Sequence, residues 1–141
     1  MFPVMPRMQI FTFLGATLLL ISCGGGGSDA APASGSVIPP SNTIYVGQTG
    51  NGYDPAANVF NPTNLQVVAG TTVTFTWRTD GHELVGGTVC APDGSFPTTG
   101  IQSTGYTKTF SVPAGATVGT VYHFICQTHC STPMACTVTV K

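Results

Sequence analysis

The sequence predicts an all-β fold, a Greek-key sandwich or barrel of about seven to eight strands. Two observations favour this fold class. Apolar and polar residues alternate over several short segments, which is the period-2 pattern of half-buried strands. The 141 residues also include 18 Gly and 11 Pro, enough for frequent turns between such segments. Strands alternating with helices at βαβ spacing are not evident, so a parallel α/β fold is not expected.

The first expected strands lie between residues 43 and 85. Residues 43–46 are a short β-branched and aromatic run, and residues 65–68 end at Ala69-Gly70. The segment 72–77 alternates strictly between threonines on one face and Val, Phe and Trp on the other. Such alternation is typical of a strand with one buried face. A further short strand is expected at residues 83–85.

The later strands are expected at 107–112, 119–126 and 137–140. The first ends at a Pro-Ala-Gly turn, and the other two place apolar side chains on a single face. Residues 86–105 do not fit the pattern, because this stretch contains two prolines and several glycines and shows little alternation. A structureless loop of that length needs something to hold it in place, and Cys90 lies within it.

The small number of charged residues excludes some classes of function. The chain has 4 Lys+Arg and 5 Asp+Glu, for a formal net charge of −1. A nucleic-acid binder that neutralises phosphates needs a clustered basic surface, so nucleic acid is excluded as a partner. A hydrophobic content of 42% also argues against disorder driven by charge.

The first 22 residues are predicted to be a signal peptide. Arg7 precedes an almost unbroken apolar run of twelve residues from position 10 to position 21. Such a run is too short to cross a bilayer, which takes about 20 residues, but it suits the apolar region of an export signal. We therefore expect the protein to be exported.

The end of the apolar run, Leu20-Ile21-Ser22-Cys23, resembles a bacterial lipobox. This resemblance implies cleavage before Cys23 and lipid attachment to Cys23, which would anchor the chain in the membrane. The alternative is an ordinary secretory signal cut at a similar place. Gly24 stands where an Asp would resemble an inner-membrane retention signal, so the outer membrane is favoured.

A tether is predicted from residue 23 to residue 42. It begins Cys-Gly-Gly-Gly-Gly-Ser and continues with Ala, Pro and Ser, without a periodic apolar face. Such a composition buries too little surface to offset the entropy of ordering. The folded domain is then expected at 43–141, which is long enough for one modest core.

Candidate metal ligands are concentrated near the C-terminus. Cys126, His129 and Met134 stand in the pattern Cys-x2-His-x4-Met, and His82 lies just after the strand at 72–77. Thiolate and thioether sulfur suit Cu(I), and imidazole suits both oxidation states of copper. Two His and one Cys with a distant axial Met form the blue-copper electron-transfer arrangement. The residues therefore predict one copper ion per domain.

The wider sequence around these residues resembles the cupredoxins, close to the plastocyanin type. The resemblance rests on Ala-Gly-x-x-Val-x-Phe-x-Trp at 69–77, Asp-Gly-His-Glu-Leu-Val at 80–85, and Tyr-x-Phe-x-Cys-x-x-His-x4-Met at 122–134. It implies that His82, Cys126 and His129 are equatorial ligands and that Met134 is the weak axial ligand. It also implies one-electron transfer between larger redox partners, with the edge of His129 as the electron port.

Four other residues have simpler interpretations. His123 alternates away from Cys126 along its expected strand, so we expect a surface histidine rather than a ligand. Trp77 is expected in the core. Asp80 and Glu83 flank His82, but two carboxylates do not make a docking patch, and electrostatic steering of a partner should be weak.

The remaining cysteines leave the disulfides open. If Cys23 carries lipid and Cys126 binds copper, an odd number remains, namely Cys90, Cys130 and Cys136. The His-Cys pair at 129–130 resembles the plant phytocyanins, and this resemblance implies a disulfide between Cys90 and Cys130. A rival pairing joins Cys90 to Cys136. Two disulfides that consume Cys126 would abolish the copper site.

These observations favour a membrane-tethered blue copper protein that shuttles single electrons in the cell envelope, in the periplasm or at the cell surface. We expect a monomer whose partners are redox proteins and, through Cys23, a membrane. A copper-binding or delivery protein is the first alternative, and a metal-free adhesive β-sandwich is the second. Enzymatic activity is not expected, because four ligands leave no open coordination position and no triad is visible.

Overall fold

The computed structural model describes residues 38–48 and 58–141. The predicted signal peptide at 1–22, the lipid attachment at Cys23 and most of the tether at 23–42 lie outside the described residues. None of the helical structure in the described part of the chain is both long and apolar enough to cross a membrane.

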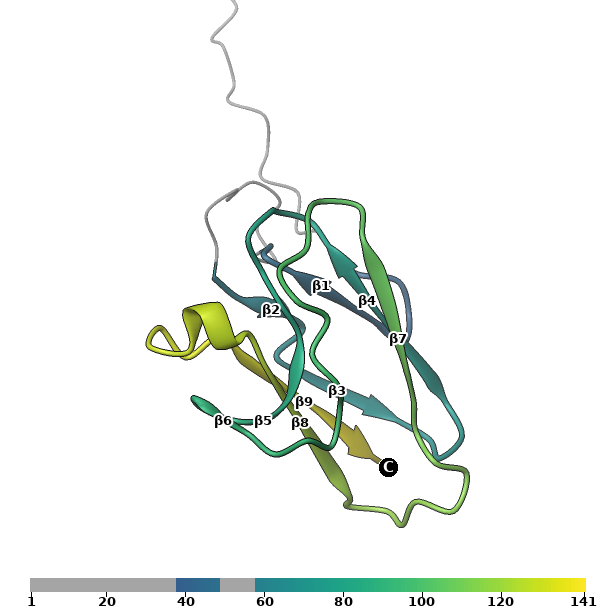
Figure 1. Ribbon diagram of the computed structural model, residues 1–141. Helices are drawn as coiled ribbons and strands as arrows, with labels where there is room; N and C mark the ends of the chain where they lie inside the picture. Colours follow the sequence, from purple (N-terminus) through teal and green to yellow (C-terminus); the bar gives the residue numbers. More distant parts are fainter. Residues whose placement is uncertain (1–37, 49–57) are drawn as a thin grey trace, which may run out of the picture. The chain divides into compact units, whose positions relative to one another are not determined.

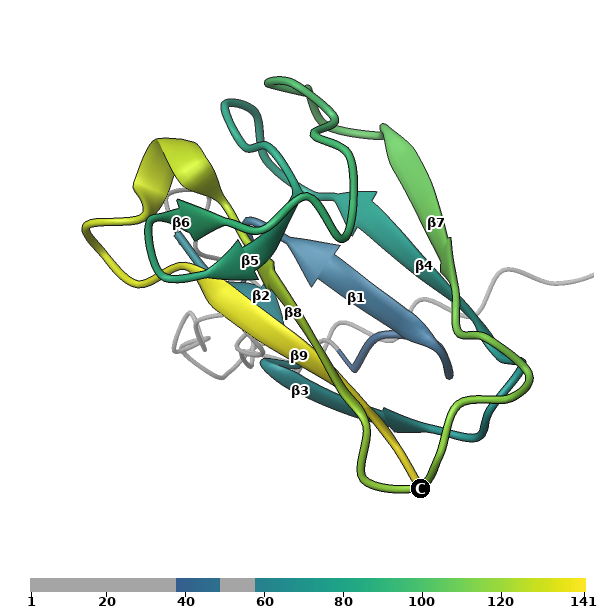
Figure 2. The ribbon, with the colours of Figure 1, turned by 60° about the horizontal axis from the view of Figure 1, so that its bottom comes forward.

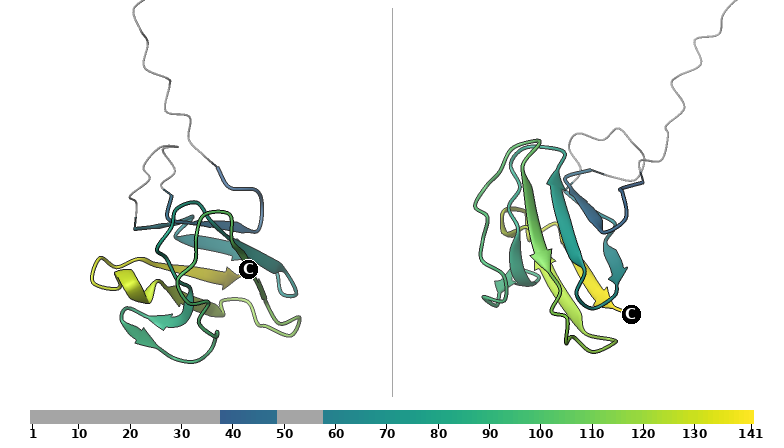
Figure 3. Two further views of the ribbon diagram at one scale, coloured as in Figure 1. Left: turned by 45° about the horizontal axis from the view of Figure 1, so that its top comes forward. Right: turned by 90° about the vertical axis from the view of Figure 1, so that its right-hand side faces the viewer.

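The described residues form two β-sheets packed face to face as a sandwich (Figures 1 and 3). The first sheet has the strand order β2-β1-β4-β7. Strand β1 pairs in parallel with β4, and the other pairs in this sheet are antiparallel. Its strands are β1 (Thr43–Val46), β2 (Phe60–Asn61), β4 (Thr72–Trp77) and β7 (Thr107–Ser111).

The second sheet has the order β3-β9-β8-β5-β6, with β3 and β9 parallel and the other neighbours antiparallel. Strands β8 and β9 run side by side along the middle of this sheet (Figure 2). The strands are β3 (Asn64–Val67), β5 (Val85–Thr88), β6 (Ala91–Pro92), β8 (Val121–Ile125) and β9 (Ala135–Val140).

The predicted all-β class is confirmed, and the alternation predicted for 72–77 matches β4 over its whole length. The described chain has nine strands rather than seven or eight, because β2 and β6 are two-residue strands that carry no periodic pattern. The strand expected at 83–85 instead covers 85–88. These differences lie at the ends of the elements, where a pattern of two or three residues is least informative.

The core lies between the two sheets and is centred on Phe124 of β8, whose ring is 1% exposed. Its ring centroid lies 5.0 Å from that of Phe75, 5.5 Å from Phe96 and 5.1 Å from Phe110. Aromatic pairs at such distances contribute beyond the area that they bury. Phe124 therefore joins β4, β7 and the long loop after β6 into one packed unit.

The stretch 86–105 is more ordered than its composition predicts. Strand β5 turns back into the short strand β6, and the Gly86 amide donates to the Phe96 carbonyl at 3.1 Å. Phe96 is 7% exposed and belongs to the core. The prediction that something holds this stretch in place is confirmed, and the Phe96 side chain is one such anchor against the sandwich.

A disulfide joins Cys90, in the turn between β5 and β6, to Cys130, and their Cα atoms lie 5.0 Å apart. This is the pairing that the likeness to phytocyanins implies. The rival pairing with Cys136 is not formed, because Cys136 is a buried free thiol on β9. Burial raises the pKa of the Cys136 thiol, so this cysteine stays protonated.

Replacing Phe124 by Ala should lower the free energy of unfolding by about 3–5 kcal/mol, because it leaves a cavity among three packed rings. Urea-induced unfolding of the protein measures this change. Val118→Ala is the control, because Val118 is 78% exposed and its replacement should cost no more than about 0.5 kcal/mol. Equal losses in the two variants would contradict the described core.

Replacing Cys90 and Cys130 together by Ser should lower the free energy of unfolding by roughly 3–4 kcal/mol, because the disulfide closes a loop with a sequence separation of 40 residues. Denaturant unfolding of the oxidised protein measures the loss. Addition of a reductant should weaken the unsubstituted protein by a similar amount and leave the double variant unchanged. A double variant as stable as the oxidised protein would count against the disulfide.

Candidate metal centre

Two segments far apart in the sequence bring the predicted ligands together at one end of the sandwich. His82 lies in the connection between β4 and β5, and it pairs with Gln102 in an isolated bridge. Cys126 follows β8 directly and precedes the short 3-10 helix η1 (Gln127–His129). Met134 immediately precedes β9. The copper loop, defined here as residues 126–134, therefore connects two neighbouring strands of the second sheet (Figure 2).

Three of the predicted ligands form a compact triangle. The Nδ1 atoms of His82 and His129 lie 3.2 Å apart, and the Sγ atom of Cys126 lies 3.8 Å from the first and 3.4 Å from the second. A point equidistant from the corners of such a triangle lies about 2 Å from each, which is a normal metal–nitrogen distance and slightly short for metal–sulfur. The three side chains can thus hold one metal ion without a large rearrangement.

Most of the centre is shielded from water. Cys126 is 0% exposed, Met134 1% and His82 3%, whereas His129 is only half-buried. Burial lowers the pKa of His82, and the neighbouring His129 lowers it further. Both effects favour the neutral imidazole, which is the form that binds a metal.

Hydrogen bonds hold the His82 backbone in place. The indole Nε1–H of Trp77 donates to the His82 carbonyl at 2.9 Å, and the Gln102 amide donates to the same oxygen at 2.8 Å. Trp77 lies in the core as predicted, with 0% exposure. Its indole also links that core directly to a ligand, and alternation along a strand could not reveal this second role.

Further hydrogen bonds tie the two ligand segments to each other. The Glu83 amide donates to Cys126 Sγ at 3.4 Å, and the Glu83 carboxylate accepts from Thr98 at 3.2 Å and Thr128 at 3.4 Å. The Cys126 amide donates to the Met134 carbonyl at 3.0 Å and closes the copper loop. An N–H group directed at a ligand sulfur stabilises negative charge there and tunes a bound metal.

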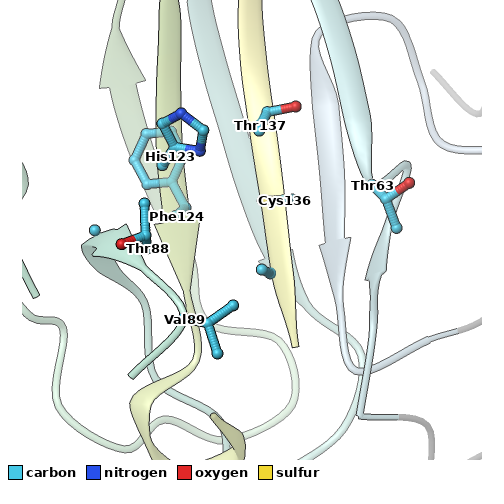
Figure 4. A pocket seen from close by; sticks show the side chains of 9 residues that line it. Thr63, Thr88, Val89, His123, Phe124, Cys136 and Thr137 are labelled. Atoms are coloured by element: carbon cyan, nitrogen blue, oxygen red, sulfur yellow. The ribbon is translucent and has the colours of Figure 1, made fainter. Parts of the chain in front are cut away.

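His123 lies outside the metal centre, on the strand face that its alternation predicts. The group of residues able to hold a metal within the described chain contains His82, Cys126 and His129 but not His123. His123 instead lines a cavity of about 240 Å³ beside Thr88 and Thr137. Figure 4 shows its ring beside the Thr137 side chain of the neighbouring strand.

Two residues near His82 were missed by sequence reasoning. The Thr79 hydroxyl lies 3.0 Å from His82 Nε2, and it donates to the Gly47 carbonyl at 2.9 Å. Thr79 stands three residues before His82 in a Thr-Asp-Gly turn, which is a weak signal in a chain with so many threonines. Gly47 directly follows β1, and the sequence gives no indication that it has a role at the site.

The donor set fits copper better than other metals. One thiol, two imidazoles and a buried thioether are soft or borderline donors, and this combination is the one that copper electron-transfer sites use. The triangle also matches the trigonal arrangement of two imidazole nitrogens and one sulfur in such sites.

No protein-family model and no curated protein matches the chain. Solved structures do match it. A purple cupredoxin from Nitrosopumilus maritimus is 24% identical, with 70% of this chain and 98% of that chain covered and a TM-score of 0.51. A P52G mutant of amicyanin, in its reduced Cu(I) form, is 16% identical, with coverage of 77% and 90% and a TM-score of 0.50.

These likenesses show the fold, and the geometry of the described residues shows the site. The protein has a cupredoxin-like fold on which His82, Cys126 and His129 form the donor triangle of a type 1 copper site, with the buried Met134 at the end of the same loop.

Proposed function

We propose that the protein is a one-electron carrier of the cell envelope, anchored by lipid on Cys23 and acting as a monomer. The observation that carries this proposal is the close placement of three donor atoms, all within 4.8 Å of one another. In this proposal His82, Cys126 and His129 are equatorial ligands, and Met134 is the weak axial ligand. Bound copper would supply the redox chemistry by alternating between Cu(II) and Cu(I).

Rigidity of the ligands supports electron transfer. His82 is held by bonds to its backbone carbonyl, and Cys126 by the Glu83 amide and the closure of the copper loop. The disulfide at Cys130 restrains the residue next to His129. Ligands restrained in this way change little between two oxidation states, so little energy is spent on reorganisation when an electron moves.

His129 is the proposed route by which electrons enter and leave. It is the one partly exposed member of the triangle, since Cys126 and His82 are almost completely buried. A redox partner that docks at the end of the sandwich carrying the copper loop would therefore approach this imidazole edge most closely. With so few charged residues in the chain, long-range electrostatic steering toward that end is expected to be weak.

The disulfide supports a location outside the cytoplasm, because such bonds form and persist in oxidising compartments. This agrees with the predicted signal peptide. Lipid attachment at Cys23 would then place the protein in the periplasm, with the outer membrane favoured by Gly24, or at the cell surface. Its partners would be redox proteins of the same compartment.

Addition of Cu(II) to the full chain should produce an intense blue to green absorption that arises from charge transfer between the Cys126 thiolate and copper. Cys126→Ser should abolish this absorption, and His82→Ala should weaken or abolish it. Visible absorption spectroscopy measures both effects. The matched control is Cys136→Ser, which removes the other free thiol and should keep the colour. A colourless wild-type protein, or a coloured Cys126→Ser variant, would contradict the proposed site.

The copper-loaded protein should also show a reversible one-electron wave by voltammetry. Met134→Leu should raise the reduction potential, because the axial ligand tunes it and Cu(I) tolerates the loss of a fourth ligand better than Cu(II) does. A carrier must keep its metal through the cycle, so total copper should remain bound after repeated reduction and oxidation. Loss of copper on reduction would favour copper delivery over electron transfer.

A further inference from the structure

We propose that Thr79 is a positioning residue that fixes the proton of His82 on Nε2 and so leaves Nδ1 free to bind the metal. This proposal rests on the proposed copper function. It is carried by two hydrogen bonds that share one hydroxyl group. The Thr79 oxygen lies 3.0 Å from His82 Nε2 and 2.9 Å from the carbonyl oxygen of Gly47.

Counting hydrogens decides the direction of these two bonds. A hydroxyl carries one hydrogen, and a carbonyl oxygen can only accept. If Thr79 donates to Gly47, its oxygen must accept from His82, so the imidazole hydrogen lies on Nε2. The opposite arrangement has Thr79 donating to Nε2 and His82 Nδ1–H donating toward His129, whose Nδ1 lies 3.2 Å away.

The first arrangement satisfies the Gly47 carbonyl, whereas the second does not. Gly47 is buried, and among the described residues the Thr79 hydroxyl is the one donor to its carbonyl oxygen. A buried carbonyl without a partner loses its hydration without compensation. The two hydrogen bonds that link Gly47, Thr79 and His82 therefore favour the Nε2–H tautomer of His82.

The backbone at Gly47 approaches the His82 ring closely. A Cβ atom at position 47 would collide with the Thr79 hydroxyl and would lie 2.7 Å from both Cδ2 and Nε2 of His82. The φ of Gly47 is also +81°, a conformation that glycine adopts readily. The absence of a side chain at 47 thus lets a backbone carbonyl reach Thr79 directly behind the ligand.

The consequence concerns the metal-binding side of His82. With the hydrogen on Nε2, the lone pair of Nδ1 points toward the other two donors, 3.2 Å from His129 Nδ1 and 3.8 Å from Cys126 Sγ. Outer partners of this kind fix the tautomer and orientation of ligating histidines in metalloproteins. Here the partner is a side-chain hydroxyl, so a single substitution can remove it.

The first test reads the tautomer in the metal-free, full-length chain. Long-range ¹H–¹⁵N correlation spectra of ¹⁵N-histidine-labelled protein, recorded at about pH 8 where imidazole is neutral, distinguish Nε2–H from Nδ1–H. We expect His82 to be Nε2–H in the wild type and in Thr79→Ser. Thr79→Val should populate Nδ1–H. A wild-type His82 protonated on Nδ1, or a Thr79→Val spectrum identical to the wild type, would overturn the proposal.

The second test measures copper affinity by competition with a chelator. Thr79→Val should bind copper about 10-fold to 100-fold more weakly, and Thr79→Ser should restore the wild-type value. Thr117→Val is the matched control, because Thr117 lies in the loop between β7 and β8, away from the copper loop, and should have no effect. Wild-type affinity in Thr79→Val would count against the proposal.

The two tests distinguish failure of this proposal from misfolding of a variant and from failure of the proposed copper function. If Thr79→Val does not fold, Thr79→Ala removes the same hydroxyl without adding a branched side chain, and the wild-type tautomer still decides the outcome. If the wild-type protein binds no copper, the proposed function fails. The tautomer of His82 can still be determined in that case, because its measurement needs no metal.

Discussion

The structure depends on holding three metal-binding side chains close together at one end of the sandwich. Two imidazole nitrogens and one sulfur lie within 4.8 Å of one another, and they come from segments more than 40 residues apart. The surrounding protein holds them there. It does so with neutral, directional contacts. Trp77 and Gln102 fix the backbone of His82, and the Glu83 amide reaches the sulfur of the opposite segment.

Environment separates the described cysteines into three chemical roles. Cys90 and Cys130 meet at the surface and are oxidised to a disulfide that ties the β5–β6 turn to the copper loop. Cys136 is enclosed by the core, where burial raises its thiol pKa and suppresses the thiolate. Cys126 is equally buried, but it faces two imidazoles that can share a metal ion with it and an amide N–H that stabilises negative charge on its sulfur. The same side chain thus serves as a cross-link, as a core residue and as a ligand because its neighbours differ.

The sequence predicts the parts of this molecule that depend on period and spacing. The alternation along β4 and the closeness of Cys126 and His129 are both confirmed, because each reflects contacts between residues that are neighbours in the chain. Contacts between residues far apart in the chain could not be predicted in this way. The two-residue strands β2 and β6 are defined by their partners rather than by their own residues. Thr79 likewise looks like any other threonine in the sequence. Its hydrogen bond to the Gly47 carbonyl joins segments far apart in the chain, so no local pattern could predict it.

The enclosure of the centre also distinguishes electron transfer from metal delivery. Three of the four proposed ligands are at most 3% exposed, so within the described chain the side of His129 is the most accessible approach to a bound copper ion. Exchange of ligands with an acceptor would then require the copper loop to open. Its opening is opposed by the disulfide at Cys130 and by the bond from the Cys126 amide to the Met134 carbonyl. An electron needs no such opening, because it can pass through the edge of one imidazole. The restraints that hinder metal release are therefore the ones that favour repeated electron transfer at a fixed site.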